Sequence, residues 1–271
     1  MSDKGDLILQ KLSSNQTTML GVLAGAIEVT ILQPILYCKN TVQQGLKITI
    51  DPRVMYRGLS VSILNMGVAT GLQFPITALV TKSLTGGIQR RLSNNELLFS
   101  SFAGGFLSGI VGGPLELVLI QQQRFGGNII GTPLGLIKEF GVGILTRGMF
   151  LCSIREGLFC VGYLGITPIL SRQFHEKYAV SENKSKVYAS VIAGLIAAPL
   201  SHPFDTMKTG MQGDVQRKKY GTMIQTYNQM MSEGGFSRFF KGLFFRTTRM
   251  IMGIYIINDC KLRLAPKLFR I

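Results

Sequence analysis

The chain has few of the residues on which enzymes and metal centres depend. It contains two histidines and four cysteines, and the cysteines show neither the paired spacing of a zinc site nor the pattern of a disulfide framework. It also lacks a phosphate-binding Gly-Lys-Ser loop and a nucleophile elbow. These absences argue against an enzyme, and they predict that the protein binds no metal and no cofactor.

Charged residues are scarce as well, and acidic residues are the scarcest. Asp, Glu, Lys and Arg make up 16% of the 271 residues, against about 25% in an average soluble domain, and 46% of the residues are apolar. This composition indicates a membrane protein. The formal net charge is nevertheless +15. Because the bases are scattered over apolar segments, they predict contact with anionic membrane lipids, cardiolipin among them, and no binding of nucleic acid.

No apolar segment of the chain is free of polar residues. Six such segments lie at about 17–44, 58–83, 97–122, 148–172, 187–211 and 242–264. Each is close to the ~20 residues that a membrane-spanning helix needs. Polar side chains inside a bilayer are costly unless they face a bundle interior or a water-filled cavity. The segments therefore predict six transmembrane helices around a polar central space.

One sequence motif recurs three times along the chain. It begins at Pro34, Pro114 and Pro203. A glutamine follows each proline by nine residues, at Gln43, Gln123 and Gln212. A base followed by a glycine then recurs at Arg57-Gly58, Arg147-Gly148 and Lys241-Gly242. The spacings are too long for a solenoid and fit a two-helix unit that is present three times.

We therefore expect an all-α membrane protein with a single domain over residues 1–271. The domain would consist of three pseudo-threefold repeats, at about 15–92, 93–184 and 185–271, each with two transmembrane helices and a short surface helix. The prolines should kink the first helix of each repeat.

Equal offsets from the repeated glycines predict a binding site in the central space. Asn65, Arg155 and Arg249 each follow the glycine of their repeat by seven residues, which places them at one depth, ~10 Å along their helices. We expect them to converge with Glu156 on an anionic or carboxylate-bearing solute, because guanidinium groups inside a membrane need a partner. The alternative is that Arg155 and Glu156, or Arg249 and an acid such as Glu28, only neutralise each other.

The chain resembles the mitochondrial carrier family over about residues 15–265. In that family, the proline of each odd-numbered helix is followed by an acid two residues later, a base five residues later, and then the glutamine. The third repeat has the whole motif, as Pro203, Asp205, Lys208 and Gln212. The first repeat has Lys39 but Leu36 at the acid position, and the second has Glu116 but Leu119 at the base position.

The resemblance implies a ring of three acid–base pairs that closes the matrix side of the cavity, the base of each odd helix meeting the acid of the next. On this scheme Lys39 meets Glu116, while Lys208 faces Leu36 and Asp205 faces Leu119, so we expect one ion pair of three. The repeated glutamines would belong to the same matrix gate. A second ring, on the even helices, would have acids where this chain has Ala78, Pro168 and Lys261.

The resemblance also implies a carrier of the mitochondrial inner membrane that exchanges a small metabolite by alternating access. Arg155-Glu156 is similar to the arginine-acid pair of carriers for amino acids, which favours an anionic or zwitterionic substrate. The incomplete rings favour a second hypothesis. In it, the chain is a transport-impaired accessory subunit with a structural role in a larger inner-membrane assembly, such as a respiratory complex.

Overall fold

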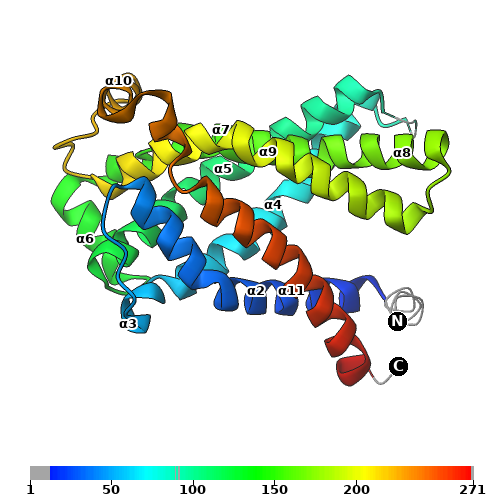
Figure 1. Ribbon diagram of the computed structural model, residues 1–271, viewed down its shortest axis with the longest axis horizontal. Helices are drawn as coiled ribbons and strands as arrows, with labels where there is room; N and C mark the ends of the chain where they lie inside the picture. Colours follow the sequence, from blue (N-terminus) through cyan, green and yellow to red (C-terminus); the bar gives the residue numbers. More distant parts are fainter. Residues whose placement is uncertain (1–12, 89, 91, 270–271) are drawn as a thin grey trace.

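The computed structural model describes residues 13–88, 90 and 92–269, and all regular structure within these residues is helical (Figure 1). The elements are α2 (Ser14–Gln43), α3 (Pro52–Met55), α4 (Leu59–Thr85), α5 (Asn94–Phe125), α6 (Gly131–Phe140), η1 (Val142–Thr146), α7 (Met149–Cys160), η2 (Val161–Ile166), α8 (Thr167–Tyr178), α9 (Glu182–Gly213), α10 (Met223–Gly234), η3 (Gly235–Phe240) and α11 (Leu243–Phe269). η2 is a π-helical stretch that joins α7 and α8 into one segment. A long helix, a short helix and a second long segment thus follow one another three times, while the repeat boundaries stay predictions.

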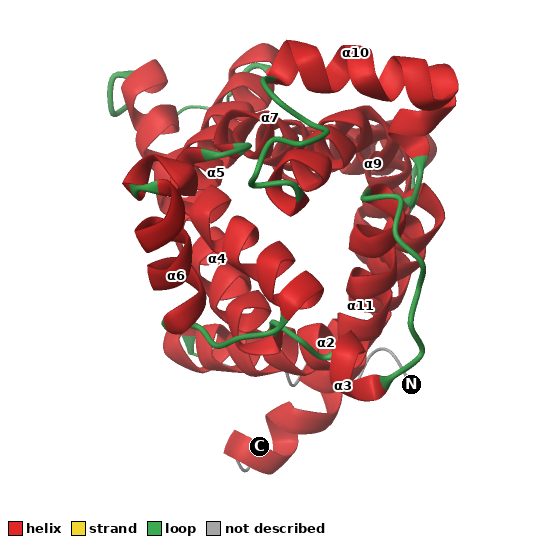
Figure 2. Ribbon diagram, turned by 90° about the vertical axis from the view of Figure 1, so that its left-hand side faces the viewer, coloured by secondary structure: helices red, strands yellow, loops and turns green. Residues whose placement is uncertain are grey.

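Five helical segments among the described residues are long and apolar enough to cross a membrane. They are Met19–Gln43, Pro52–Thr85, Asn94–Phe125, Val142–Tyr178 and Lys184–Gly213. The expected all-α membrane fold is confirmed, but the count of six spans is not. α11 has the length of a span and contacts α2 in the ring of helices (Figure 2), yet it carries Arg246, Arg249 and Asp259. Its crossing of the membrane therefore stays a prediction.

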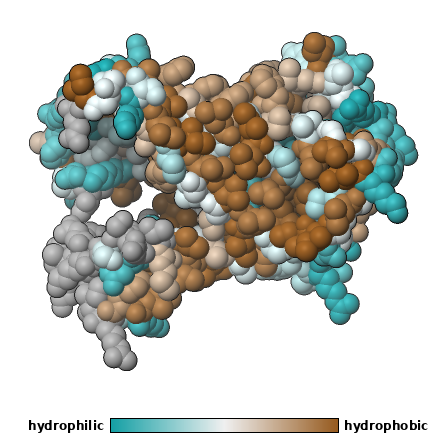
Figure 3. All heavy atoms as spheres, turned by 180° about the vertical axis from the view of Figure 1, so that it is seen from behind, coloured by the Kyte–Doolittle hydropathy of each residue, from teal (hydrophilic) through white to brown (hydrophobic). Residues whose placement is uncertain are grey.

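The outer surface has the pattern of a membrane protein. Figure 3 shows an apolar band between two hydrophilic ends, and exposed side chains such as Leu107, Val191 and Ile251 are suited to lipid. The short helices α3, α6 and α10 lie at one end, which we call the closed end (Figure 1). We call the opposite end, which carries α8, the open end, because the molecule is hollowed there (Figure 3).

Glycines let α5 and α7 lie unusually close. A Cβ atom on Gly105 would lie 2.4 Å from the carbonyl oxygen of Glu156, and one on Gly109 would lie 2.5 Å from the Cα of Ser153. Small residues permit this close approach of backbones between membrane helices. Side chains that α5 and α7 direct inward can therefore reach each other.

Three glycines fix where the second long segment of each repeat begins. Gly58, Gly148 and Gly242 have φ angles of 78°, 71° and 87° and directly precede α4, α7 and α11. Each lies against the base position of a neighbouring repeat, at Leu119, Lys208 and Lys39 respectively. A side chain at any of these glycines would be strained by the positive φ angle, and a Cβ on Gly58 would also lie 2.7 Å from Leu119. The three segments therefore begin at one level next to the closed end.

The surface helix α10 is tied to α2 through Arg238 of η3. Arg238 Nη2 donates hydrogen bonds to the carbonyl oxygen of Gln43 at 2.8 Å and to the Tyr220 hydroxyl at 2.9 Å, and Nε lies 3.0 Å from Glu233. Burial would raise the pKa of Glu233, but hydrogen bonds from Lys219 and Arg238 lower that pKa to about 2. The carboxylate stays ionised at neutral pH and helps Arg238 to join α10 to α2.

The contact of α5 with α7 can be tested by adding one methyl group. Gly109→Ala should lower the free energy of unfolding by about 1–3 kcal/mol, because the new Cβ has no room against the α7 backbone. The measurement is thermal unfolding in detergent, followed by circular dichroism because the chain has no tryptophan.

Gly71→Ala is the matched control, since this glycine lies within α4 and a Cβ there would have no neighbour within 4 Å. Helix propensity alone predicts that it is neutral or stabilises by up to ~1 kcal/mol. Equal effects of the two substitutions would contradict the close approach of α5 and α7.

Candidate functional site

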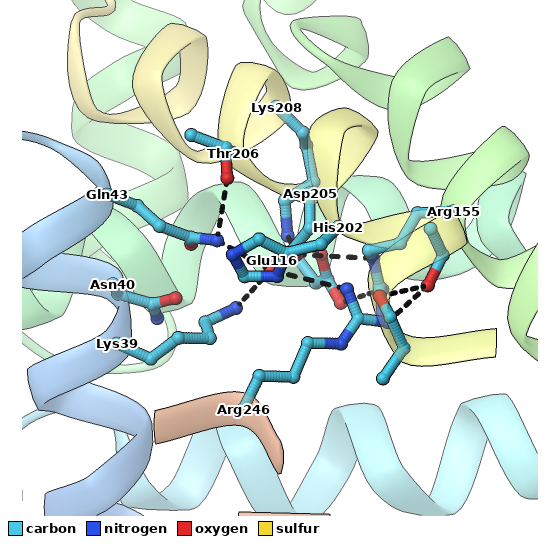
Figure 4. A network of polar contacts seen from close by, with 12 residues as sticks. Lys39, Asn40, Gln43, Glu116, Arg155, His202, Asp205, Thr206, Lys208 and Arg246 are labelled. Atoms are coloured by element: carbon cyan, nitrogen blue, oxygen red, sulfur yellow. Dashed lines mark hydrogen bonds and ion pairs between the residues drawn. The ribbon is translucent and has the colours of Figure 1, made fainter. Parts of the chain in front are cut away.

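Two lysine–carboxylate pairs lie together towards the closed end. Lys39 Nζ of α2 lies 2.7 Å from Asp205 Oδ2 of α9, and Lys208 of α9 forms an ion pair with Glu116 of α5. All four residues are buried, none more than 9% exposed. Charges at this depth are tolerated only when they are paired. The pairs therefore hold α2, α5 and α9 together at this level, which we call the gate (Figure 4).

The expected partners in the gate were wrong. The family scheme pairs Lys39 with Glu116 and leaves Lys208 and Asp205 facing leucines. In the structure each lysine meets the acid of the preceding repeat, counted cyclically, so Lys39 reaches Asp205 and Lys208 reaches Glu116. The direction of pairing depends on how the three repeats are arranged around the ring, and the motif carries no information about that. Among the described residues, two lysine–carboxylate pairs between different helices are present where one was expected.

The third position of the gate is apolar on both sides. In the observed direction of pairing, the base position Leu119 belongs with the acid position Leu36. Leu119 is buried in a cluster with Val61 and Val118, and Leu36 packs against this cluster. Both departures from the motif thus fall within one pair, and an apolar contact closes the part of the gate where an ion pair would otherwise lie.

The three repeated glutamines have different partners. Gln43 Nε2 donates to Asp205 Oδ2 at 2.9 Å and so supports a gate carboxylate. Gln123 Oε1 accepts a hydrogen bond from Asn40 at 2.6 Å. Gln212 donates to backbone carbonyl groups on α5 and just before α7. Gln43 is therefore a direct member of the gate network, whereas the other two join neighbouring helices.

Arg155 connects the gate to the side chains next to it. Its Nη2 lies 2.5 Å from Glu116 Oε1 and 2.5 Å from Glu156 Oε1, and its Nε lies 3.5 Å from Asp205 Oδ1. Gln73 of α4 donates to the other oxygen of Glu156 at 3.2 Å. One guanidinium thus contacts carboxylates on α5, α7 and α9 (Figure 4). This contact with Glu116 follows from the close approach of α5 and α7.

A cavity of about 290 Å³ adjoins the gate and is lined by residues of α2, α4, α5, α7, α9 and α11. Its wall includes the four residues expected to bind substrate, Asn65, Arg155, Glu156 and Arg249. Both neutralising pairs of the alternative interpretation are present too, since Arg249 Nη2 lies 3.3 Å from Glu28. The equal offsets from the glycines therefore lead to one cavity, and binding of substrate there stays a prediction.

Two further side chains in the wall were not among the expected site residues. Gln73 holds Glu156, and Arg246 of α11 is only 8% exposed, with its Nη1 3.8 Å from Asp205 Oδ2. Helical spacing relates both to expected residues. Gln73 lies eight residues after Asn65, and Arg246 lies three residues before Arg249, so each shares a helix face with an expected residue.

The arrangement is suited to holding a small charged solute.

A family model described as "Mitochondrial carrier protein" matches residues 181–257, which cover α9, α10 and the first half of α11. The mitochondrial aspartate-glutamate transporter AGC1 of Saccharomyces cerevisiae is 26% identical over 82% of this chain, but that match covers 28% of the yeast protein. The chain thus spans little more than a quarter of that relative's length.

Two other relatives match over most of their own length. A putative mitochondrial 2-oxoglutarate/malate carrier protein of Neurospora crassa is 24% identical over 82% of this chain and 78% of that protein. A mitochondrial glycine transporter of Yarrowia lipolytica is 23% identical over 84% of this chain and 87% of that protein. These matches, the repeated motif and the all-helical membrane fold agree with one another. The chain is similar to mitochondrial carrier proteins over more than four fifths of its length, and the family model matches its third repeat.

Proposed function

We propose that the chain is a solute carrier of the mitochondrial inner membrane that exchanges a small anionic or zwitterionic metabolite by alternating access. One observation carries the proposal: a single ion-pair network joins the cavity wall to the gate. Arg155 contacts Glu156 in the wall and Glu116 in the gate at 2.5 Å each. A solute that binds in the wall therefore disturbs the gate. Alternating access requires that the solute binds one state of the gate more tightly than the other.

The adjacent charges of Arg155 and Glu156 are suited to the two ends of a zwitterion. The guanidinium can bind a carboxylate in bidentate fashion, and the carboxylate of Glu156 can accept hydrogen bonds from an ammonium group. Gln73 keeps Glu156 in the wall through its second oxygen. The names of the aspartate-glutamate and glycine transporters among the relatives support a solute with an amino and a carboxylate group.

Competition for Arg155 would couple binding to opening. In the closed gate, Arg155 and Lys208 share Glu116. A solute carboxylate on Arg155 would weaken its bond to Glu116 and leave that acid to Lys208 alone. The apolar contact of Leu36 with the Leu119 cluster can separate without breaking an ion pair. The gate would therefore open at a lower electrostatic cost than a gate with three ion pairs.

The accessory-subunit hypothesis rested on two incomplete rings, of which the matrix ring was expected to keep one ion pair. Two ion pairs and an apolar third contact support a working closure at this end, so we favour transport. Towards the open end, Ala78, Pro168 and Lys261 occupy the expected acid positions, and Asp259 pairs with Arg263 on the same helix at 2.8 Å. We propose that closure at the open end uses contacts other than ion pairs.

Transport can be tested in proteoliposomes that are preloaded with pooled metabolites. The wild-type protein should exchange solute above the level of empty liposomes. Arg155→Ala and Arg249→Ala should each lower the rate by about 10- to 100-fold, because a hydrogen bond to a charged group contributes about 1.5–3 kcal/mol.

Arg263→Ala is the matched control for Arg249→Ala. Arg263 lies on the same helix, its side chain is 75% exposed, and it pairs only with its neighbour Asp259 among the described contacts. It should leave the exchange rate unchanged. No exchange by folded wild-type protein across the whole pool would refute the carrier and favour the accessory subunit.

The apolar part of the gate predicts a coupling between two substitutions. Leu119→Lys alone should destabilise the protein by about 3–5 kcal/mol, because it buries a charge without a partner. Leu36→Glu alone should destabilise it less, because Leu36 is only partly buried. The double variant should regain about 1–3 kcal/mol relative to the sum of the two effects, since the new charges form the missing pair. Thermal unfolding in detergent measures all three effects.

The control combines Leu36→Glu with Leu107→Lys. Leu107 lies on the same helix as Leu119 but is 43% exposed and twelve residues away. Its effect should add to that of Leu36→Glu without coupling. Additive effects of the pair at positions 36 and 119 would show that the two side chains are not partners.

A further inference from the structure

The described side chains in and around the cavity carry one more positive than negative charge. Five bases line it: Lys39, Lys208, Arg155, Arg246 and Arg249. Three acids line it, Glu116, Glu156 and Asp205, and a fourth, Glu28, pairs with Arg249. An unbalanced charge inside a membrane is costly and by default marks a functional site. The unbalanced base is therefore a candidate ligand-binding residue.

Four of the five bases have an acid of their own. The pairs are Lys39 with Asp205, Lys208 with Glu116, Arg155 with Glu156 and Arg249 with Glu28. Arg246 comes no closer to a carboxylate than 3.8 Å, from Nη1 to Asp205 Oδ2. That oxygen already contacts Lys39 Nζ at 2.7 Å and Gln43 Nε2 at 2.9 Å. Arg246 therefore shares Asp205 with Lys39 and is the base without an acid of its own.

Arg246 is held in position, but its hydrogen-bonding capacity is not used up. Its Nη2 donates to the Ser201 hydroxyl at 2.7 Å, while Nη1 has no hydrogen-bond partner and the side chain is 10% exposed. It extends from α11 towards Asp205 and Arg155 (Figure 4). In the same wall, the Nε atoms of Arg155 and Arg249 also lack a hydrogen-bond partner. Three arginines thus have N–H groups to offer, and N–H groups of this kind bind carboxylates.

We infer that the cavity takes a solute with one net negative charge, and that Arg246 binds the acidic group that gives the solute this charge. The inference rests on the proposed function and deepens it, because it names the charge class of the solute. Such a solute makes the cavity neutral. It also gives Arg246 an acid of its own.

An acidic amino acid has this charge and matches the wall group by group. One carboxylate binds Arg155, the ammonium group binds Glu156, and the second carboxylate binds Arg246. A neutral amino acid leaves Arg246 unbalanced. A dicarboxylate without an amino group brings one negative charge too many and offers nothing to Glu156. The site therefore selects by charge among solutes of similar size.

Three probes of similar size separate these charge classes: glutamate, glutamine and 2-oxoglutarate, with net charges of −1, 0 and −2. Binding of the radiolabelled probes to the purified full chain in detergent gives each affinity without requiring transport. The wild-type protein should bind glutamate at least about tenfold more tightly than either of the other probes.

Substitutions at Arg246 test the assignment of the residue. Arg246→Gln should weaken glutamate binding at least about tenfold and leave glutamate and glutamine bound about equally. Arg246→Lys keeps the positive charge and should keep the preference for glutamate. Arg263→Gln, an exposed arginine on the same helix, should change neither affinity. If Arg246→Gln does not fold, the three wild-type affinities and the glutamate preference of Arg246→Lys still test the inference.

The inference is overturned if wild-type protein binds none of the probes or binds glutamine as tightly as glutamate. It is also overturned if the preference survives Arg246→Gln. Charge-selective binding that depends on Arg246, in a protein that exchanges no solute, would refute the proposed transport and keep this assignment. Exchange of a neutral solute that is insensitive to Arg246→Gln would support the proposed transport and refute this assignment.

Discussion

The structure depends on the mutual compensation of charges that are buried inside the ring of helices. Each ionised group costs several kcal/mol to bury alone, and a close opposite charge recovers that cost only with good geometry. Asp205 is the centre of this compensation, since Lys39, Lys208, Arg155 and Arg246 all lie within 4 Å of its carboxylate. Moving one of these helices away would leave several charges unpaired at once. The glycines of α5 and the glycines before α4, α7 and α11 matter because they allow the required approach.

Charge compensation also explains why the two leucines, Leu36 and Leu119, occupy the two positions of one pair. An acid at position 36 facing Leu119, or a base at position 119 facing Leu36, would leave one buried charge without a partner. With leucine at both positions, the gate lacks one acid and one base together, and its charge balance is unchanged. Removing both partners of a buried pair is often nearly neutral in free energy, whereas removing one is strongly destabilising. The two departures from the family motif are therefore physically a single change.

Local patterns in the sequence predicted the depth of residues along one helix. They did not predict which residues pair across helices, because that depends on how the helices are arranged. Seven residues from a glycine is a distance along one helix, so Asn65, Arg155 and Arg249 could be assigned to one level. Whether Lys39 meets Glu116 or Asp205 depends on which repeat lies on which side of α2, and no motif within one repeat encodes that. Arg246 was difficult for a related reason. Its lack of an acid of its own becomes visible only once the acids of the other helices have been assigned to other bases.

On the proposed function, Arg155 and Arg246 link the selection of the solute to the opening of the gate. Both contact Asp205, and Arg155 also contacts Glu116, so the same bases that would hold a solute hold the gate acids when no solute carboxylate is bound. A solute with too little negative charge cannot draw these bases away from the acids. A solute with too much negative charge draws them away but leaves the cavity unbalanced. Only a solute that replaces the lost contacts charge for charge lets the gate acids separate from the arginines without a net electrostatic penalty, and the same replacement must be reversed when the solute leaves.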